Sequence, residues 1–201
     1  MRTLARVLAL ALALAALLAG CAAGPPSRFY SLTAVPPRAS RRAPGLMLQI
    51  AAVHIPAILE RQEIVRESTP NLLQLSNRNR WGAPLAAMIR QVLEQDLAAR
   101  LRGSTLLPAE AAAPAGTHVL VIDLLRFDVG PSGTVRLQGS WMQFAPDGTR
   151  PVLTRQITLA AAHPASGYRS QTAAMSRLLG RLADRIAATV TRRPAQLSSG
   201  A

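Results

Sequence analysis

The sequence predicts an α/β fold: a single domain with a mixed β-sheet and two main helices packed on it. Two long segments repeat apolar residues with helical spacing, and several short segments alternate apolar and polar residues as strands do. Turn signals divide residues 117–161 into consecutive strands, which indicates an antiparallel meander in the second half. Earlier strands reach the sheet through longer connections, so we expect a mixed sheet.

Strands are expected in the first half at residues 29–32, 46–53, 64–67 and 72–75. The last two flank Ser68-Thr69-Pro70-Asn71, which has the composition of a hairpin turn. A stretch rich in Pro and Arg separates the first two strands and has no periodicity.

The first helix is expected to run from Pro84 to about Leu101, because proline is tolerated in a first helical turn. Its apolar residues recur on one face, which should be buried. They are Leu85, Ile89, Val92, Leu93 and Leu97.

In the second half, strands are expected at 117–127, 134–144 and 152–161, with Asp147-Gly148 as a hairpin signal before the last. The first of these is apolar on both faces from Val119 to Ile122, which predicts a central strand covered on two sides. A closing helix is expected at 170–191, with an apolar stripe that we interpret as core. The stripe comprises Met175, Leu178, Leu179, Leu182, Ile186 and Val190.

Residues 1–20 have the layout of a secretory signal peptide: two arginines, an apolar run over 7–18, then Ala19-Gly20. The run is too short to span a bilayer, which needs about 20 apolar residues. Leu18-Ala19-Gly20-Cys21 resembles the lipobox of bacterial lipoproteins, in which cleavage precedes the cysteine and the thiol carries a diacylglycerol. An ordinary signal peptide or anchor beside a chance cysteine is the alternative.

This interpretation divides the chain into a signal peptide (1–20), a lipidated tether (21–28), the α/β domain (29–193) and a disordered tail (194–201). Ala22 follows Cys21, so no acidic residue holds the second mature position. In Gram-negative lipoproteins this resembles cargo sorted to the outer membrane. We therefore expect a protein that is lipid-anchored in the outer membrane and faces the periplasm.

The net charge of +13 comes from 23 basic residues, all of them arginine. Loss of the two signal-peptide arginines leaves +11. The arginines are dispersed, and no nucleic-acid-binding motif accompanies them, which argues against a nucleic-acid partner. Attraction to anionic lipid headgroups, worth about 1 kcal/mol per basic residue near such a surface, explains the charge better.

Motifs of catalysis and metal binding are absent from the sequence. It contains no G-x-x-x-x-G-K loop, no H-E-x-x-H, no cysteine pair and no G-x-S-x-G elbow. The three histidines, His54, His118 and His163, lack metal-ligand spacing. We predict no catalytic residue, no metal and no cofactor besides the lipid on Cys21; an envelope hydrolase with spatially paired carboxylates is the distant alternative.

Two segments carry a family resemblance. The run from Ile55 to Arg66 (IPAILERQEIVR), followed by Asn71 and by 79–85 (NRWGAPL), is similar to the signature of the PqiC-like ABC-type transport auxiliary lipoproteins. The second segment has Arg126-Phe127-Asp128 and continues to Trp141. The sequence departs from the family pattern at Ile58, where an aromatic is common, and at Gly82-Ala83, which replaces a small-acidic pair.

The resemblance implies a mixed α/β fold and a non-catalytic part of an envelope lipid-transport system that supports membrane integrity. In such systems an inner-membrane ABC transporter works with a bridge protein of the mammalian-cell-entry (MCE) type, which the auxiliary lipoprotein docks. A homo-oligomer, such as a ring, would suit a ring-shaped partner. The alternative is a free-standing periplasmic lipoprotein that binds a phospholipid or small ligand in its own pocket.

Within these segments we predict five partner-binding residues. Arg61, Gln62 and Arg66 lie on or beside an irregular Pro-containing segment, where long polar side chains can form a docking surface. Arg80 and Trp81 are of the types enriched at interface hot spots.

Structural roles are the alternatives for three of these residues. Trp81 can cap the core beneath the helix start, and Arg61 and Arg66 can form salt bridges with Glu60, Glu63 or Glu67. Arg126 and Asp128, on either side of Phe127, are expected to serve the sheet.

Overall fold

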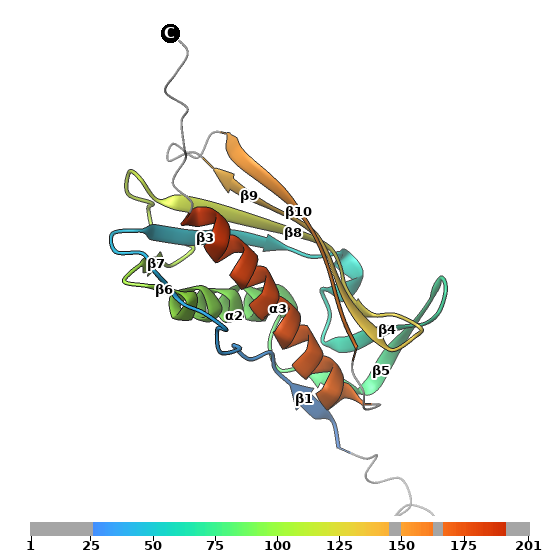
Figure 1. Cartoon of the computed structure of the whole chain (residues 1–201). Coiled ribbons are helices and arrows are strands. Elements are labelled where there is room, and N and C mark those ends of the chain that lie inside the picture. Colours follow the sequence, from blue (N-terminus) through green and yellow to red (C-terminus); the bar gives the residue numbers. More distant parts are fainter. Residues whose placement is uncertain (1–25, 145–149, 163–166, 192–201) are drawn as a thin grey trace, which may run out of the picture.

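The computed structural model describes residues 26–144, 150–162 and 167–191. Two α-helices and a set of strands follow one another in these residues (Figure 1). The order is β1 (Arg28–Tyr30), β2 (Arg41–Arg42), β3 (Met47–His54), the 3-10 helix η1 (Ala57–Leu59), β4 (Glu63–Thr69), β5 (Leu72–Trp81), α2 (Leu85–Arg100), β6 (Leu101–Arg102), β7 (Thr105–Leu107), β8 (His118–Val129), β9 (Thr134–Phe144), β10 (Pro151–Ala162) and α3 (Tyr168–Val190).

The main sheet has five strands in the order β10-β9-β8-β3-β7. Its β8–β10 part is the predicted antiparallel meander, whereas β3 runs parallel to both β8 and β7. The mixed sheet predicted from the sequence is therefore confirmed. Asp147 and Gly148, the predicted hairpin signal, lie outside the described residues.

A bulge in β8 keeps one face of that strand apolar along its whole length. Leu120, Ile122 and Leu124 face the core, and the register shift before Arg126 returns Phe127 to the same side. Gly139 lies opposite this bulge, where a Cβ atom would come 2.1 Å from the carbonyl oxygen of Asp123. Only glycine lets the two strands approach this closely.

Both helices cover the same face of the main sheet (Figure 1). The apolar stripe of α3 is almost completely buried against the sheet and α2, which confirms its role in the core. The expectation that β8 is covered on two sides is only partly right. Leu120 and Ile122 are fully buried under the helices, but Val119 and Val121 on the opposite face are half-buried.

A second sheet of three strands, β1-β5-β4, was not predicted. β5 extends to Trp81, well beyond the predicted 72–75, and β1 pairs with this extension in parallel. Most of β5 is polar and exposed, so it lacks the alternation that signals a strand. The hairpin turn is at Pro70-Asn71, where Asn71 has a φ of 68° that asparagine tolerates.

The segment after β1 lies between the two helices. The amide of Thr33 donates to Ser176 Oγ of α3 at 3.1 Å, and the amide of Val35 donates to Asp96 Oδ1 of α2 at 2.9 Å. A Cβ atom at Gly180 would come 3.1 Å from Val35 Cβ, so the small residue makes room for the segment. The chain that enters through β1 is thereby fixed to both helices.

Arg100 and Asp96 form the buried polar centre of this helix–helix contact. Arg100 donates to Asp96 Oδ1 at 3.0 Å, to Asp184 Oδ1 at 2.6 Å and to the carbonyl oxygen of Val35 at 3.1 Å. Burial raises the pKa of Asp96, and the bonds from Val35 and Arg100 oppose this rise. The cluster joins α2, α3 and the entering chain.

Candidate functional site

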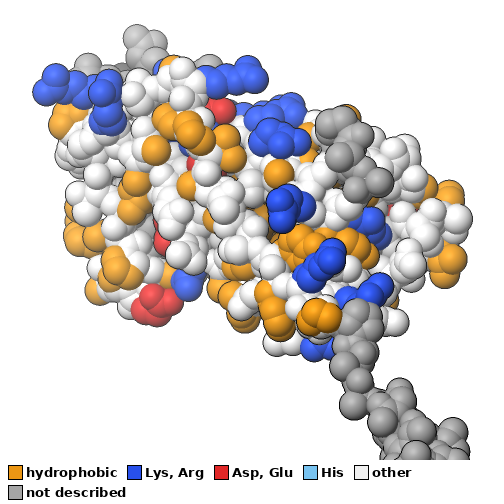
Figure 2. All heavy atoms as spheres, turned by 90° about the horizontal axis from the view of Figure 1, so that it is seen from below, with side chains coloured by type: hydrophobic (Ala, Val, Ile, Leu, Met, Phe, Trp, Pro, Cys, Tyr) orange, Lys and Arg blue, Asp and Glu red, His pale blue; other side chains and the backbone are white. Residues whose placement is uncertain are grey.

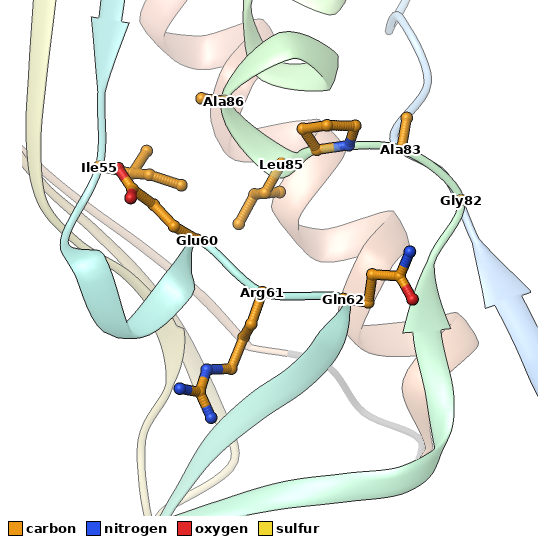
Figure 3. A pocket seen from close by; sticks show the side chains of 9 residues that line it. Ile55, Glu60, Arg61, Gln62, Gly82, Ala83, Leu85 and Ala86 are labelled. Atoms are coloured by element: carbon orange, nitrogen blue, oxygen red, sulfur yellow. The ribbon is translucent and has the colours of Figure 1, made fainter.

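A groove lies between the irregular segment before β4 and the start of α2 (Figure 3). Its volume is about 430 Å³, and its walls are mainly apolar. The lining residues come from the two parts of the first family-like segment and the residue that follows it: Ile55, Glu60, Arg61, Gln62, Gly82, Ala83, Pro84, Leu85 and Ala86. Folding thus brings together two stretches about 20 residues apart.

Main-chain hydrogen bonds hold the walls of the groove in place. The amide of Trp81 donates to the carbonyl oxygen of Gln62 at 2.7 Å, and that of Gly82 donates to Tyr30 at 2.9 Å. In η1 the amide of Leu59 donates to Pro56 at 2.8 Å. The backbone is therefore fixed while the side chains on the rim remain available.

Arg61 and Gln62 are exposed on this rim. Figure 3 shows Gln62 directed toward Gly82, Arg61 extending away from the helix start, and Leu85 pointing into the space between the walls. No ion pair in the described part of the chain involves Arg61, so the predicted alternative of a salt bridge to Glu60, Glu63 or Glu67 is wrong for this residue.

Arg66 has a different environment, five residues further along. Its guanidinium lies 3.8 Å from the centre of the Tyr168 ring, and its Nε donates to Gln171 Oε1 of α3 at 2.6 Å. The predicted salt bridge to a neighbouring glutamate is again wrong. Arg66 joins β4 to the start of α3 instead of lining the groove.

Trp81 and Arg80 do not line the groove either. Trp81 is 3 % exposed and packs in the core just before the helix start, which agrees with its structural alternative and removes its ring from any partner's reach. Arg80 is half-buried. Of the five predicted partner-binding residues, the structure brings only Arg61 and Gln62 to one site, and Cys21 lies outside the described residues.

A charged network lies outside the groove. Arg126 donates to Glu67 Oε2 at 2.8 Å and to Asp128 Oδ2 at 3.2 Å, while Arg136 bonds both Glu67 and Asp128. The hydrogen bond from Arg136 is the main reason that the pKa of Glu67 is lowered. The network ties β4 to β8 and β9, so Arg126 and Asp128 serve the sheets as expected. The pairing of Glu67 with Arg126 and Arg136 was missed because these partners are some 60 residues away in the sequence.

The histidines with described surroundings have local partners. His54 Nδ1 lies 2.6 Å from Asp123 Oδ1, and His118 Nδ1 lies 2.8 Å from Gln143 Nε2. Across residues 26–144, 150–162 and 167–191, no group of three or more His, Cys, Asp or Glu residues is placed to hold a metal ion. Within the same ranges, no helix combines the length and apolar character needed to span a membrane.

Comparison with known families identifies the class of this protein. Residues 30–187 match the family described as ABC-type transport auxiliary lipoprotein component. The match covers most of the chain, so the protein belongs to this family of transport components. No curated protein matches the chain.

Two solved structures share the fold. An uncharacterised protein superposes with a TM-score of 0.69 at 18% sequence identity, over 83% of this chain and 100% of its own. Protein XCC0632 from Xanthomonas campestris, of the DUF330 family, superposes with a TM-score of 0.62 at 16% identity, over 79% of this chain and 92% of its own. At these identities the likeness concerns the fold alone.

Proposed function

We propose that this family member is a non-catalytic, lipid-anchored subunit of an envelope lipid-transport system that docks a periplasm-spanning partner. In this proposal Cys21 carries the lipid and the domain faces the periplasm from the outer membrane. The partner is an MCE-type bridge protein, which works with an inner-membrane ABC transporter. The complex supports membrane integrity.

The groove is the observation that carries this proposal. It lies between the two parts of the first family-like segment, its backbone is fixed by main-chain bonds, and Arg61 and Gln62 are exposed on its rim. An apolar hollow with a polar rim is the arrangement found at protein interfaces, where an apolar side chain of the partner fills the hollow.

A second candidate is the direct binding of a phospholipid or small ligand in the same groove. Its volume of about 430 Å³ and its apolar walls, including Ile55, Pro84 and Leu85, favour this alternative. The two candidates differ in what occupies the groove in the native envelope.

Photo-crosslinking distinguishes them. A photoreactive amino acid in place of Gln62 should capture an MCE-type protein from native membranes, and the same amino acid in place of Gln156, an exposed glutamine on β10, should not. Equal capture from both positions contradicts docking at the groove. Adducts of phospholipid alone at position 62 favour the second candidate.

The anchor is tested separately. Cys21→Ala should give a folded but unanchored protein that is mislocalised and does not complement a deletion of the gene. Full complementation by this unanchored form would show that anchoring is not required.

A further inference from the structure

We propose that the domain binds phospholipid headgroups directly, through the surface at which the chain enters it. This tether-end surface consists of Arg28, Phe29, Arg78 and Arg169. It would rest against the anionic headgroup layer that holds the anchor. The inference rests on the proposed anchoring at Cys21, because the anchor determines which end of the domain meets the membrane.

The length of the tether places this end close to the bilayer. Six residues separate Cys21 from Arg28, so even a fully extended chain spans only about 25 Å between them. The opposite end of the domain lies beyond this reach, since α3 has 23 residues and is about 35 Å long. In Figure 1, β1 lies at one end of the molecule, next to the start of α3, and α3 ends at the other.

The pairing of β1 with β5 brings two arginines together at the entry point. Arg28 lies opposite Asn79, and Arg28 and Arg78 line a hollow of about 140 Å³ with Pro26 and Asn79. One lining residue, Asn79, is held in place by hydrogen bonds: its side-chain amide donates to Ser76 Oγ at 2.7 Å, and Tyr30 donates to Asn79 Oδ1 at 3.1 Å. Two arginines that line a hollow with a fixed wall suit the phosphate of a headgroup.

Arg169 and Phe29 extend this surface. The ring of Tyr168 lies 6.0 Å from that of Tyr30, so the first turn of α3, with exposed Arg169, is beside β1. Phe29 is 64 % exposed, and an exposed aromatic ring among arginines is typical of proteins that lie on the membrane interface. Figure 2 looks at this end of the molecule and shows Arg and hydrophobic side chains intermingled, with few acidic ones.

The charges of this surface are not neutralised by the fold. Within the described ranges, no ion pair involves Arg28, Arg78 or Arg169, whereas Arg126 and Arg136 are each paired with two carboxylates. Charge complementarity and the short tether together favour an anionic lipid surface over a protein partner at this end.

The first experiment measures binding of the unlipidated mature chain, starting at Ala22, to vesicles of equal parts phosphatidylglycerol and phosphatidylethanolamine. The wild type should bind them and should not bind phosphatidylcholine vesicles. The double variant Arg28→Gln/Arg78→Gln should bind the anionic vesicles about 25-fold more weakly, because each arginine contributes a factor of about five to the affinity. Both side chains are exposed, so the variant should fold.

A matched pair at the other end is the control. Arg42 and Arg102 are exposed and line one hollow. They lie opposite each other where β2 pairs with β6, directly beyond the C-terminal end of α2 and about 24 Å along the helix from its start beside Tyr30. Arg42→Gln with Arg102→Gln should change binding by less than about twofold, since these residues lie at the other end of α2 from β1 and outside the proposed contact surface. Equal losses in both pairs, no loss in the first pair, or no binding by the wild type would overturn the proposal.

The second experiment locates the contact. A Phe29→Trp variant should be quenched by bromine-labelled phosphatidylglycerol, whereas Val152→Trp, at an exposed position on β10, should not. The native Trp81 and Trp141 are buried and provide a constant background. Equal quenching at both positions, or none at position 29, contradicts the orientation. Neither experiment contains a partner protein, so a negative result here does not contradict docking at the groove. Failed crosslinking at Gln62, in turn, does not contradict lipid binding at the tether-end surface.

Discussion

Arginine has opposite roles in two regions of the molecule: it is buried and paired at the contact between the two helices, and it is exposed on the surface around the groove. Arg100, between the helices, is 2 % exposed and donates hydrogen bonds to two carboxylates and two carbonyl oxygens. Arg61, on the groove, is exposed and has no ion pair within the described ranges. All basic residues of this chain are arginine, so the residue type does not separate structural arginines from those available for recognition. The difference depends on whether distant elements place a partner beside the guanidinium group.

The comparison has an energetic consequence. An arginine whose bonds are internal leaves buried carboxylates unpaired when it is removed, so its loss lowers stability. An arginine at the surface changes recognition and leaves the fold intact. Four predictions test this division, ordered by their expected effect on stability.

Arg100→Ala should have the largest effect. It leaves Asp96, which is completely buried, without its cation, and removing one partner of a buried ion pair costs about 3–5 kcal/mol. We expect the melting temperature to fall by about 10 °C or more, measured by circular dichroism. Arg102→Ala, two residues further on and exposed, is the control and should melt as the wild type does. Similar melting of both variants would contradict the role given to Arg100.

Arg66→Ala should have an intermediate effect. It removes the stacking on Tyr168 and the bond to Gln171, which together contribute about 2 kcal/mol. Urea unfolding measures this loss, with Arg61→Ala as the matched control from the same segment. If Arg66→Ala unfolds at the same urea concentration as the wild type, Arg66 is a surface residue after all.

Glu67→Gln tests the charged network through its pH dependence. The folded protein lowers the pKa of Glu67 below its ordinary value of 4.5, so the stabilisation is present above pH 4.5 and is lost as the pH falls through the lower folded value. The wild type should melt higher than Glu67→Gln at pH 7, and the difference should shrink in acid. A difference that stays constant down to low pH would show that the network does not depend on this carboxylate.

Arg61→Glu should have the smallest effect on stability and a large one on recognition. We expect an unchanged melting temperature, because the side chain has no ion pair in the described structure, and a marked loss of partner capture in pull-downs from envelope membranes. Arg155→Glu, an exposed arginine on β10, should capture the partner normally. A large decrease in the melting temperature of Arg61→Glu would show that Arg61 has a structural role.

Periodicity in the sequence predicted both helices and the main sheet, because their apolar faces are buried and their spacing follows from burial. The strand predicted at 29–32 corresponds to β1, but the sequence showed neither its pairing with β5 nor the end of β5. The side chains there are mostly exposed, and their stability comes from backbone pairing with distant residues. β2, β6 and β7 are only two or three residues long and carry no periodic signal.

The site could be predicted only in part for a related reason. The motif identified both walls of the groove, but it did not separate Arg61 from Arg66. The difference depends on Tyr168 and Gln171, which lie about 100 residues later and approach β4 only in the folded chain. For Trp81, burial follows from its position at the end of β5, beyond the part of that strand (72–75) that the sequence predicted.

The parallel pairing of β1 with β5 has a mechanical consequence for a chain anchored through Cys21, as proposed. A pull between the membrane and the domain acts along β1, so its hydrogen bonds to β5 are loaded together in shear and are not peeled apart one at a time. Behind them, the bonds from Thr33 to Ser176 and from Val35 to Asp96 pass the load to both helices. The same short segment that connects the domain to its anchor would thus let it hold a partner under tension without unravelling from its N-terminal end.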